Sequence, residues 1–162
     1  MNDNPRQLLR RIRILLGIMI AGLVVSGVTA FPLLHEIDVL HGWLGKASVP
    51  ASVTAWIGKV HEGLHATHRA YPFLAYGTDW LAFGHLVIAI FFIGPFMDPV
   101  RNFWVVRAGQ IACVLVIPLA LIGGAIREIP LWWRLIDSAF GVVGLVPLCL
   151  AARLIRRLES SR

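Results

Sequence analysis

Charged residues are scarce in this sequence. Of its 162 residues, 15% are Asp, Glu, Lys or Arg and 57% are hydrophobic, and the mean hydropathy is +0.74. Because about 25% of the residues of an average soluble domain are charged, this composition indicates a protein whose apolar surface is solvated by lipid. The length is that of one domain, so we expect residues 1–162 to form a single membrane domain.

Cysteine is also rare, and nucleotide-binding motifs are missing. Cys113 and Cys149 lie in apolar runs without Cys-x-x-Cys spacing, so we interpret them as apolar packing residues. The sequence contains no glycine-rich phosphate loop and no Ser-His-Asp order typical of a hydrolase. These absences exclude Cys-x-x-Cys redox chemistry and argue against nucleotide binding and serine hydrolysis.

Long apolar runs are what the sequence does contain. Four are of the length that crosses a bilayer: residues 14–34, 79–97, 104–124 and 131–152. The predicted fold is therefore all-α, a polytopic bundle of four transmembrane helices. The arginine-rich head and the small residues at 26–30 also fit a cleavable signal peptide. The first run is longer than a typical signal core, which favours a retained span.

Positive charge is distributed unevenly around these runs. Ten arginines and three acidic residues flank them on one side, a net charge of +7, whereas five basic and six acidic residues on the other side give −1. This asymmetry predicts an inner-membrane protein with both termini in the cytoplasm. Arginines placed in this way meet anionic headgroups, so the expected partners are the lipid bilayer and other membrane subunits or a second copy, and not nucleic acid.

The segment 35–78 is expected outside the cytoplasm. Apolar residues recur there twice at helical spacing, first as Leu34, Ile37, Leu40 and Leu44 and then as Val53, Ile57, Val60 and Leu64. Ser48 and Pro50 interrupt the pattern between them. We predict two short amphipathic helices, with Trp43 and Trp56 as interfacial anchors.

A polar layer is predicted between the second and fourth spans. His85 lies about 9 Å beyond Asp79 along a helix, and Asp137 lies about 10 Å beyond Pro130, so the two share one depth. Arg134 falls on the same face of its helix as Asp137. We therefore predict a contact between His85 and Asp137, oriented by Arg134.

This layer has two interpretations. In the functional one it is an outward-facing proton-handling, quinone-facing or metal site, with Asp79, Tyr71 and Tyr76 at its mouth and Ser26, Thr29 and Ser138 contributing. In the structural one Arg134 pairs with Asp137 three residues later and His85 bonds a neighbouring helix. The structural interpretation is favoured.

Residues 61–65 read His-Glu-Gly-Leu-His and match the His-Glu-x-x-His zincin pattern. His61 and His65 share a helix face and suit zinc, while Glu62 suits the activation of a water molecule. A third ligand is missing, because His68 lies about 10 Å along the axis from His61. His85 and Glu128 are the candidates considered for it. Weaker metal binding through His61, His65 or His68, or a solvated histidine face, are the alternatives, and the solvated face is favoured.

Haem is a further alternative. Haem ligation by two histidines needs axial ligands on facing helices, and only His85 lies within a predicted span. His35 or His41 would have to supply the second ligand.

Two strings carry a resemblance: YPFLAYGTDWLAF at 71–83 and WRLIDSAFGVVGL at 133–145. They resemble strings in uncharacterised small four-span bacterial inner-membrane proteins, over about residues 71–158 of this chain. The resemblance implies the same fold class and brings no function with it.

The function expected from these features is that of a non-enzymatic accessory or scaffold subunit of a membrane complex. The alternative is a membrane-embedded redox, proton-handling or metal-dependent protein, with an outward-facing site around His85, Asp137 and Arg134.

Overall fold

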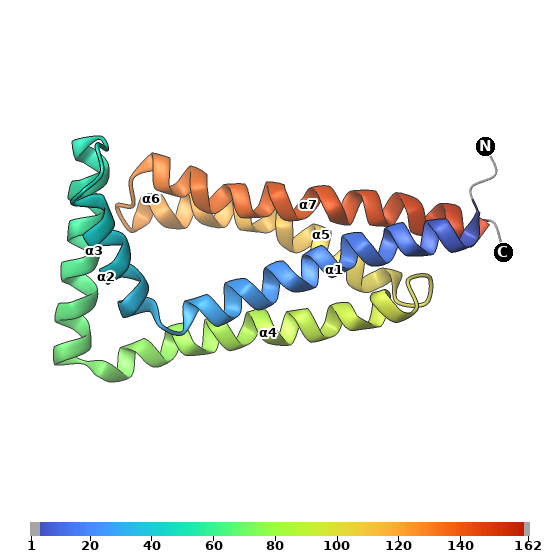
Figure 1. The fold of residues 1–162 in the computed structure, drawn as a ribbon, viewed down its shortest axis with the longest axis horizontal. Coiled ribbons are helices and arrows are strands. Elements are labelled where there is room, and N and C mark those ends of the chain that lie inside the picture. The colour runs from blue at the N-terminus through green and yellow to red at the C-terminus, as the bar shows by residue number, and fades with distance from the viewer. Residues whose placement is uncertain (1–3, 161–162) are drawn as a thin grey trace. The chain divides into compact units, whose positions relative to one another are not determined.

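The computed structural model describes residues 4–160, and these residues form helices and no strand (Figure 1). The helices are α1 (Pro5–Ala30), α2 (Leu33–Leu44), α3 (Ala51–Ala70), α4 (Tyr76–Met97), α5 (Phe103–Pro118), α6 (Gly124–Ile126) and α7 (Leu131–Ser160). A 3-10 turn, η1 (Pro72–Ala75), precedes α4, and a π-helical turn, η2 (Leu119–Gly123), joins α5 to α6. The predicted all-α class is confirmed for the described residues.

Four helical segments are long and apolar enough to cross a membrane, as the sequence predicted. They are Pro5–Ala30, Pro72–Met97, Phe103–Ile126 and Leu131–Ser160. Each contains most of one predicted apolar run.

The first of these helices differs in its bounds from the apolar run at 14–34. It begins at Pro5, because proline suits the first turn of a helix, and it includes the arginine-rich head. It ends at Ala30, because Pro32 has no backbone N–H and disfavours helical geometry at Phe31. The residues after Pro32 belong to α2.

The last helix runs eight residues past the predicted end at Ala152, to Ser160. Arginine and leucine are good helix formers and dominate this extension. Ile155 and Leu158 within it are buried, so packing as well as propensity continues the helix.

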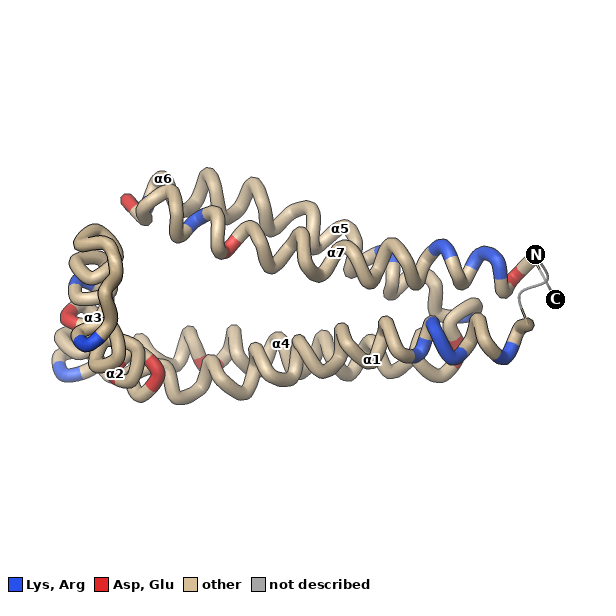
Figure 2. Tube along the Cα trace, turned by 45° about the horizontal axis from the view of Figure 1, so that its top comes forward, with Lys and Arg blue, Asp and Glu red and all other residues tan. Residues whose placement is uncertain are grey.

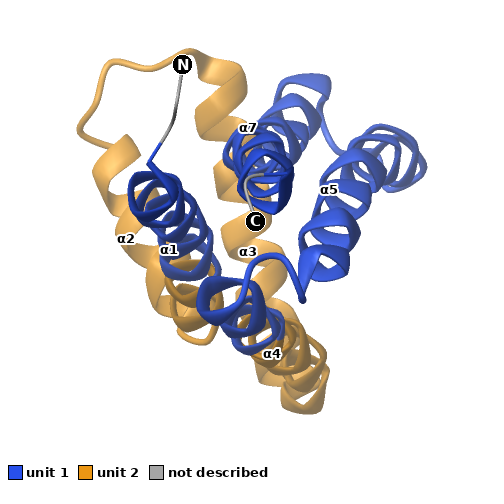
Figure 3. Ribbon diagram, turned by 90° about the vertical axis from the view of Figure 1, so that its right-hand side faces the viewer, with its two compact units in different colours: residues 1–23, 88–162 blue, residues 24–87 orange. Residues whose placement is uncertain are grey.

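The chain divides into two compact units (Figure 3). Unit 1 comprises residues 1–23 and 88–162, and unit 2 comprises residues 24–87. Both divisions fall inside helices, the first in α1 and the second in α4.

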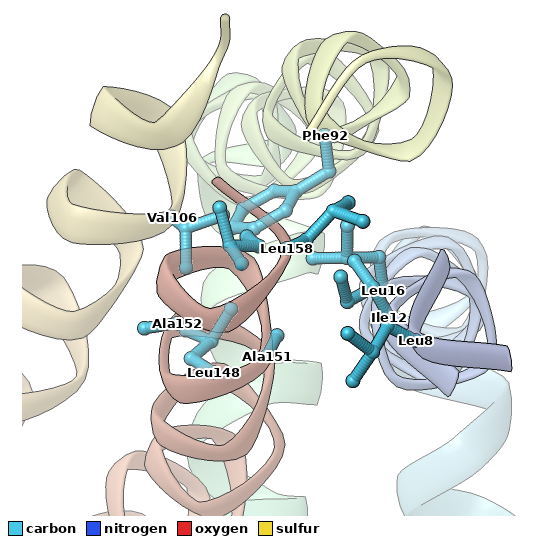
Figure 4. Packing of buried hydrophobic residues seen from close by; sticks show 10 residues of the cluster. Leu8, Ile12, Leu16, Phe92, Val106, Leu148, Ala151, Ala152 and Leu158 are labelled. Carbon is cyan, nitrogen blue, oxygen red and sulfur yellow. The ribbon is translucent and has the colours of Figure 1, made fainter. Parts of the chain in front are cut away.

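The apolar core of unit 1 is built from four helices (Figure 4). Its buried residues are Leu8, Ile12 and Leu16 of α1, Phe92 of α4, Val106 of α5, and Leu148, Ala151, Ala152, Ile155 and Leu158 of α7. The α1 residues recur every four positions and so form one stripe of that helix. Burial along this stripe fixes which face of α1 is turned to the core and which carries its arginines outward.

Helices α5 and α7 approach each other closely at Gly141. A Cβ atom there would collide with the carbonyl oxygen of Cys113 and lie 2.5 Å from Cγ1 of Val116. Gly141 follows Asp137 by four residues and Arg134 precedes Asp137 by three, so the three residues share one face of α7. Gly141 is buried on that face, and Arg134 and Asp137 are half-buried.

Unit 2 contains α2 and α3 packed along each other (Figure 1), with Ile37, Leu44 and Ile57 buried. In the same unit the end of α1 approaches α4 through Gly27, where a Cβ atom would lie 2.8 Å from the carbonyl oxygen of Ala82. Ser26, which was expected to contribute to the polar layer, is exposed.

Candidate metal centre

A carboxylate and two imidazoles converge between α2 and α3. Oδ1 of Asp38 lies 2.9 Å from Nε2 of His61 and 2.7 Å from Nε2 of His65. Because a carboxylate oxygen only accepts hydrogen bonds, both imidazoles donate to it. The three potential ligand atoms all lie within 4.8 Å of one another, and all three residues belong to unit 2.

Local structure explains this convergence. His61 and His65 are four residues apart on α3, so both side chains leave the same face of the helix. Residues 45–50 return the chain so that α3 packs along α2 and faces Asp38. Buried Ile37 and Ile57 on the same two helices hold them together beside the cluster.

His41 supports the cluster from α2, one turn beyond Asp38. Its ring stacks on that of His61, with the centroids 4.5 Å apart and the planes inclined by 18°. The rings of His61 and His65 are 4.6 Å apart and tilted by 49°. Stacking by His41 therefore restricts the plane of His61, and a restricted ring is how proteins orient metal-binding histidines.

The cluster is accessible from solvent. The side chain of Asp38 is 46% exposed, and those of His61 and His65 are 30% and 34% exposed. The hydrogen bond from His65 lowers the pKa of the Asp38 carboxyl below its ordinary value. Desolvation acts in the opposite direction but is the smaller effect. An ionised Asp38 at neutral pH gives the cluster the negative charge that a cation needs.

The geometry fits a transition metal ion. Zinc binds imidazole nitrogen and carboxylate oxygen at about 2.0–2.2 Å, so tetrahedral ligand atoms lie about 3.3 Å apart. The present separations of 2.7 and 2.9 Å are set by hydrogen bonds, so an ion would require the carboxylate to move outward and the imidazole protons to leave. Two imidazoles and one carboxylate are ligands of zinc and of non-haem iron, and both leave coordination positions for water.

The structure therefore brings the two predicted histidines together with a residue that the sequence analysis missed. Asp38 supplies the third potential ligand of the group, and neither His85 nor Glu128, the candidates considered for that role, belongs to it. His68 is exposed outside the cluster. Glu62 is also exposed, and among residues 4–160 its carboxylate makes no hydrogen bond or ion pair.

His85 is half-buried in α4, and its Nδ1 donates to the carbonyl oxygen of Leu81, 2.8 Å away in the same helix. The structural interpretation expected a bond to a neighbouring helix. Since a carbonyl only accepts, this bond places the proton on Nδ1 and leaves Nε2 as an acceptor in the neutral ring. His85 lies in unit 2 and Asp137 in unit 1, so their contact stays a prediction.

The other residues predicted at the mouth of this layer lie in unit 2. Asp79, in the first turn of α4, lines a shallow groove of about 220 Å³ whose other walls are aromatic: Phe31, Tyr76, Trp80 and Phe83. Thr29 donates to the carbonyl oxygen of Val25 in its own helix. His41, one of the histidines considered for haem, is stacked on His61.

Arg134 does not form the expected ion pair with Asp137 in the described part of the chain. Its Nη1 instead donates to the carbonyl oxygen of Leu121, 3.1 Å away in the π-helical turn, and its methylene groups cover Gly124. Its Nε is buried without a hydrogen-bond partner among residues 4–160. Ser138 donates to the backbone carbonyl of Arg134. Arg134 therefore bonds to the segment of the chain that precedes α7 and not to Asp137.

No protein-family model, no curated protein and no solved structure matches this chain. The function of the cluster is therefore inferred from its residues and their geometry.

Proposed function

We propose that this chain is a membrane-anchored metal-binding protein in which Asp38, His61 and His65 hold one divalent ion of the zinc class. The observation that carries the proposal is the meeting of both imidazoles on one oxygen of Asp38. The two histidines lie four residues apart on α3, whereas the carboxylate that they share comes from α2. The proposal assigns binding and no hydrolysis, because Glu62 is exposed and makes no bond to the three ligands.

The charge distribution supports an extracytoplasmic position for this centre. In unit 1 the beginning of α1, the turn between α4 and α5, and the end of α7 lie at one end of the unit, and basic residues gather there (Figure 2). Eight described arginines lie in these segments, and Arg107 follows in the second turn of α5, against two acidic residues, Asp98 and Glu159. By the positive-inside rule this end faces the cytoplasm of an inner membrane. Helices α2 and α3 follow the first span and so belong on the opposite side.

Metal analysis of the purified protein tests the proposal. After incubation with zinc and removal of the excess, elemental analysis should give about one zinc per chain, since the three ligands form one site with a coordination position left for water. Asp38→Asn and His65→Ala should each reduce the retained zinc at least about tenfold. His68→Ala is the matched control, because His68 lies on the same helix outside the cluster. Equal loss in the His68 variant, or retention of zinc in the Asp38 variant, contradicts the proposal.

A role as an accessory or scaffold subunit is a second candidate. Its support is the third span, Phe103–Ile126, which packs against α7 but leaves Ile111, Val114, Leu115, Leu119 and Ile122 exposed, so that an apolar face remains for lipid or a partner helix. Ala112→Trp, at an exposed position of α5, should break a partner contact without disturbing the fold of this chain. An unchanged complex size in mild detergent assigns this surface to lipid.

A further inference from the structure

A groove lined by arginines runs along the first turns of α1. Arg6, Arg10 and Arg13 are spaced four and three residues apart, so they share one face of the helix. With Leu9, Ile14 and Phe96 they enclose about 440 Å³. All six residues belong to unit 1.

The arginines differ in what they contact. Nε of Arg13 donates to the backbone carbonyl oxygen of Phe96, 3.2 Å away, and its guanidinium lies 5.9 Å from the centre of the Phe96 ring. Arg6 and Arg10 are exposed, and among residues 4–160 neither forms an ion pair with a carboxylate. No described residue that lines the groove is acidic. The groove thus presents one fixed and two unneutralised guanidinium groups.

The rest of the lining is apolar. Leu9 is half-buried, and Ile14 and Phe96 are exposed. An inorganic anion would contact the guanidinium groups and leave this surface in water, whereas a ligand with both an anionic group and a hydrocarbon chain uses all six residues. The groove therefore matches an amphiphile.

The position of the groove along the chain indicates which amphiphile. The apolar run of the first span begins at Ile14, so Arg6 to Arg13 lie at the level of the lipid headgroups when α1 crosses the bilayer. Basic pockets at this depth on the cytoplasmic side attract the headgroups of anionic lipids. Guanidinium groups also form paired hydrogen bonds with phosphate oxygens.

We propose that this groove binds one anionic phospholipid of the cytoplasmic leaflet. Arg6, Arg10 and Arg13 hold its phosphodiester, and Leu9, Ile14 and Phe96 contact the first carbons of an acyl chain. This site is separate from the metal centre in sequence and chemistry, and its test does not depend on metal binding.

Retention of lipid by the full-length protein tests this site. The protein is exchanged into detergent with equal amounts of phosphatidylglycerol and phosphatidylcholine that have the same acyl chains, and native mass spectrometry counts the bound lipids. The wild type should retain one phosphatidylglycerol in preference to phosphatidylcholine. Arg6→Gln with Arg10→Gln should reduce that preference at least about tenfold, since a direct hydrogen bond to a charged group contributes about tenfold or more.

A second double variant is the matched control. Arg11→Gln with Arg101→Gln removes the same charge from exposed positions that do not line the groove, and it should change the preference less than about twofold. An equal loss in both double variants indicates diffuse charge and overturns the site, as does an unchanged preference in the first. Complete displacement of the lipid by an equal concentration of inorganic phosphate also overturns it. Circular dichroism should show the same helix content in all variants.

Discussion

Arg134 and Gly124 depend on each other at the scale of single residues. A Cβ atom on Gly124 would lie 2.6 Å from both Cγ and Cδ of Arg134, because the arginine side chain crosses the glycine on its way to the carbonyl of Leu121. The absence of a side chain at position 124 is what allows Arg134 to reach that carbonyl.

Gly124→Ala should therefore destabilise the protein although alanine favours helix. We expect a loss of about 1–3 kcal/mol, since the arginine is displaced from its site and its hydrogen bond is broken. Gly123→Ala is the control, because a Cβ atom there meets only Cδ1 of Leu119 at an ordinary 3.8 Å. Thermal unfolding in detergent measures both. Equal effects of the two substitutions would show that Arg134 does not need the space.

The lowered pKa of Asp38 predicts a pH dependence. A carboxyl whose pKa is depressed in the folded protein contributes stability above its unfolded-state pKa of about 3.9 and loses that contribution as the pH falls through the folded value. The hydrogen bond from His65, the main cause of the shift, should thus stabilise α2 against α3 at neutral pH and fail only in acid.

Hydrogen exchange in α2 and α3 between about pH 6 and pH 3 tests this expectation. In the wild type the protection of these helices should fall below about pH 4, and in Asp38→Asn this part of the pH dependence should be absent. Val39→Asn, at an exposed neighbouring position, should keep the wild-type profile. A matching pH profile in the Asp38 variant contradicts the role of the carboxyl.

At the scale of helices, the contact between α5 and α7 depends on Gly141. A Cβ atom at this position meets backbone, which cannot rotate away, whereas one at Gly144 meets Sγ of Cys113 at 3.1 Å, a side chain with some freedom to move. The two glycines are one turn apart on the same helix and differ in what they face.

Gly141→Ala should therefore cost about 1–3 kcal/mol of stability, and Gly144→Ala distinctly less. Unfolding titrations of the two variants in detergent or lipid give the comparison directly. If Gly144→Ala proves the more damaging of the two, α5 and α7 do not pack through Gly141.

Hydropathy and helical spacing predicted the all-helical class and the four long apolar helices, because each is a property of consecutive residues. Asp38, the third member of the candidate metal group, was not predictable in this way. Asp38 lies next to Ile37 in a helix whose periodicity shows which side is apolar, and what Asp38 faces depends on how residues 45–50 return the chain. The register between two helices is not encoded in the pattern of either one.

The same limit applies to Arg134. Its spacing from Asp137 predicted an ion pair, and the long side chain instead reaches a carbonyl in the preceding π-helical turn. Periodicity places both residues on one face but does not reveal a backbone acceptor thirteen residues earlier.

At the scale of the whole molecule, the charge asymmetry predicts which segments lie on each side of the membrane. A reporter fused after Ser48, between α2 and α3, should be extracytoplasmic, and one fused after Ser160 should be cytoplasmic, because the arginine-rich ends stay on the inner side. Paired fusions to alkaline phosphatase and to a fluorescent protein measure the two locations. Phosphatase activity at Ser160 with fluorescence at Ser48 would place the metal centre in the cytoplasm.

The hydrogen bond from His61 to Asp38 joins residues 23 positions apart. An ion bound there acts as a reversible cross-link that closes this loop, and loops of that length restrict the unfolded chain by about 3 kcal/mol in the chain-entropy view. A bound ion would therefore make the separation of α2 from α3 less favourable, and a chelator would reverse this effect. Limited proteolysis within residues 45–50 should therefore be slower with bound zinc than after chelation.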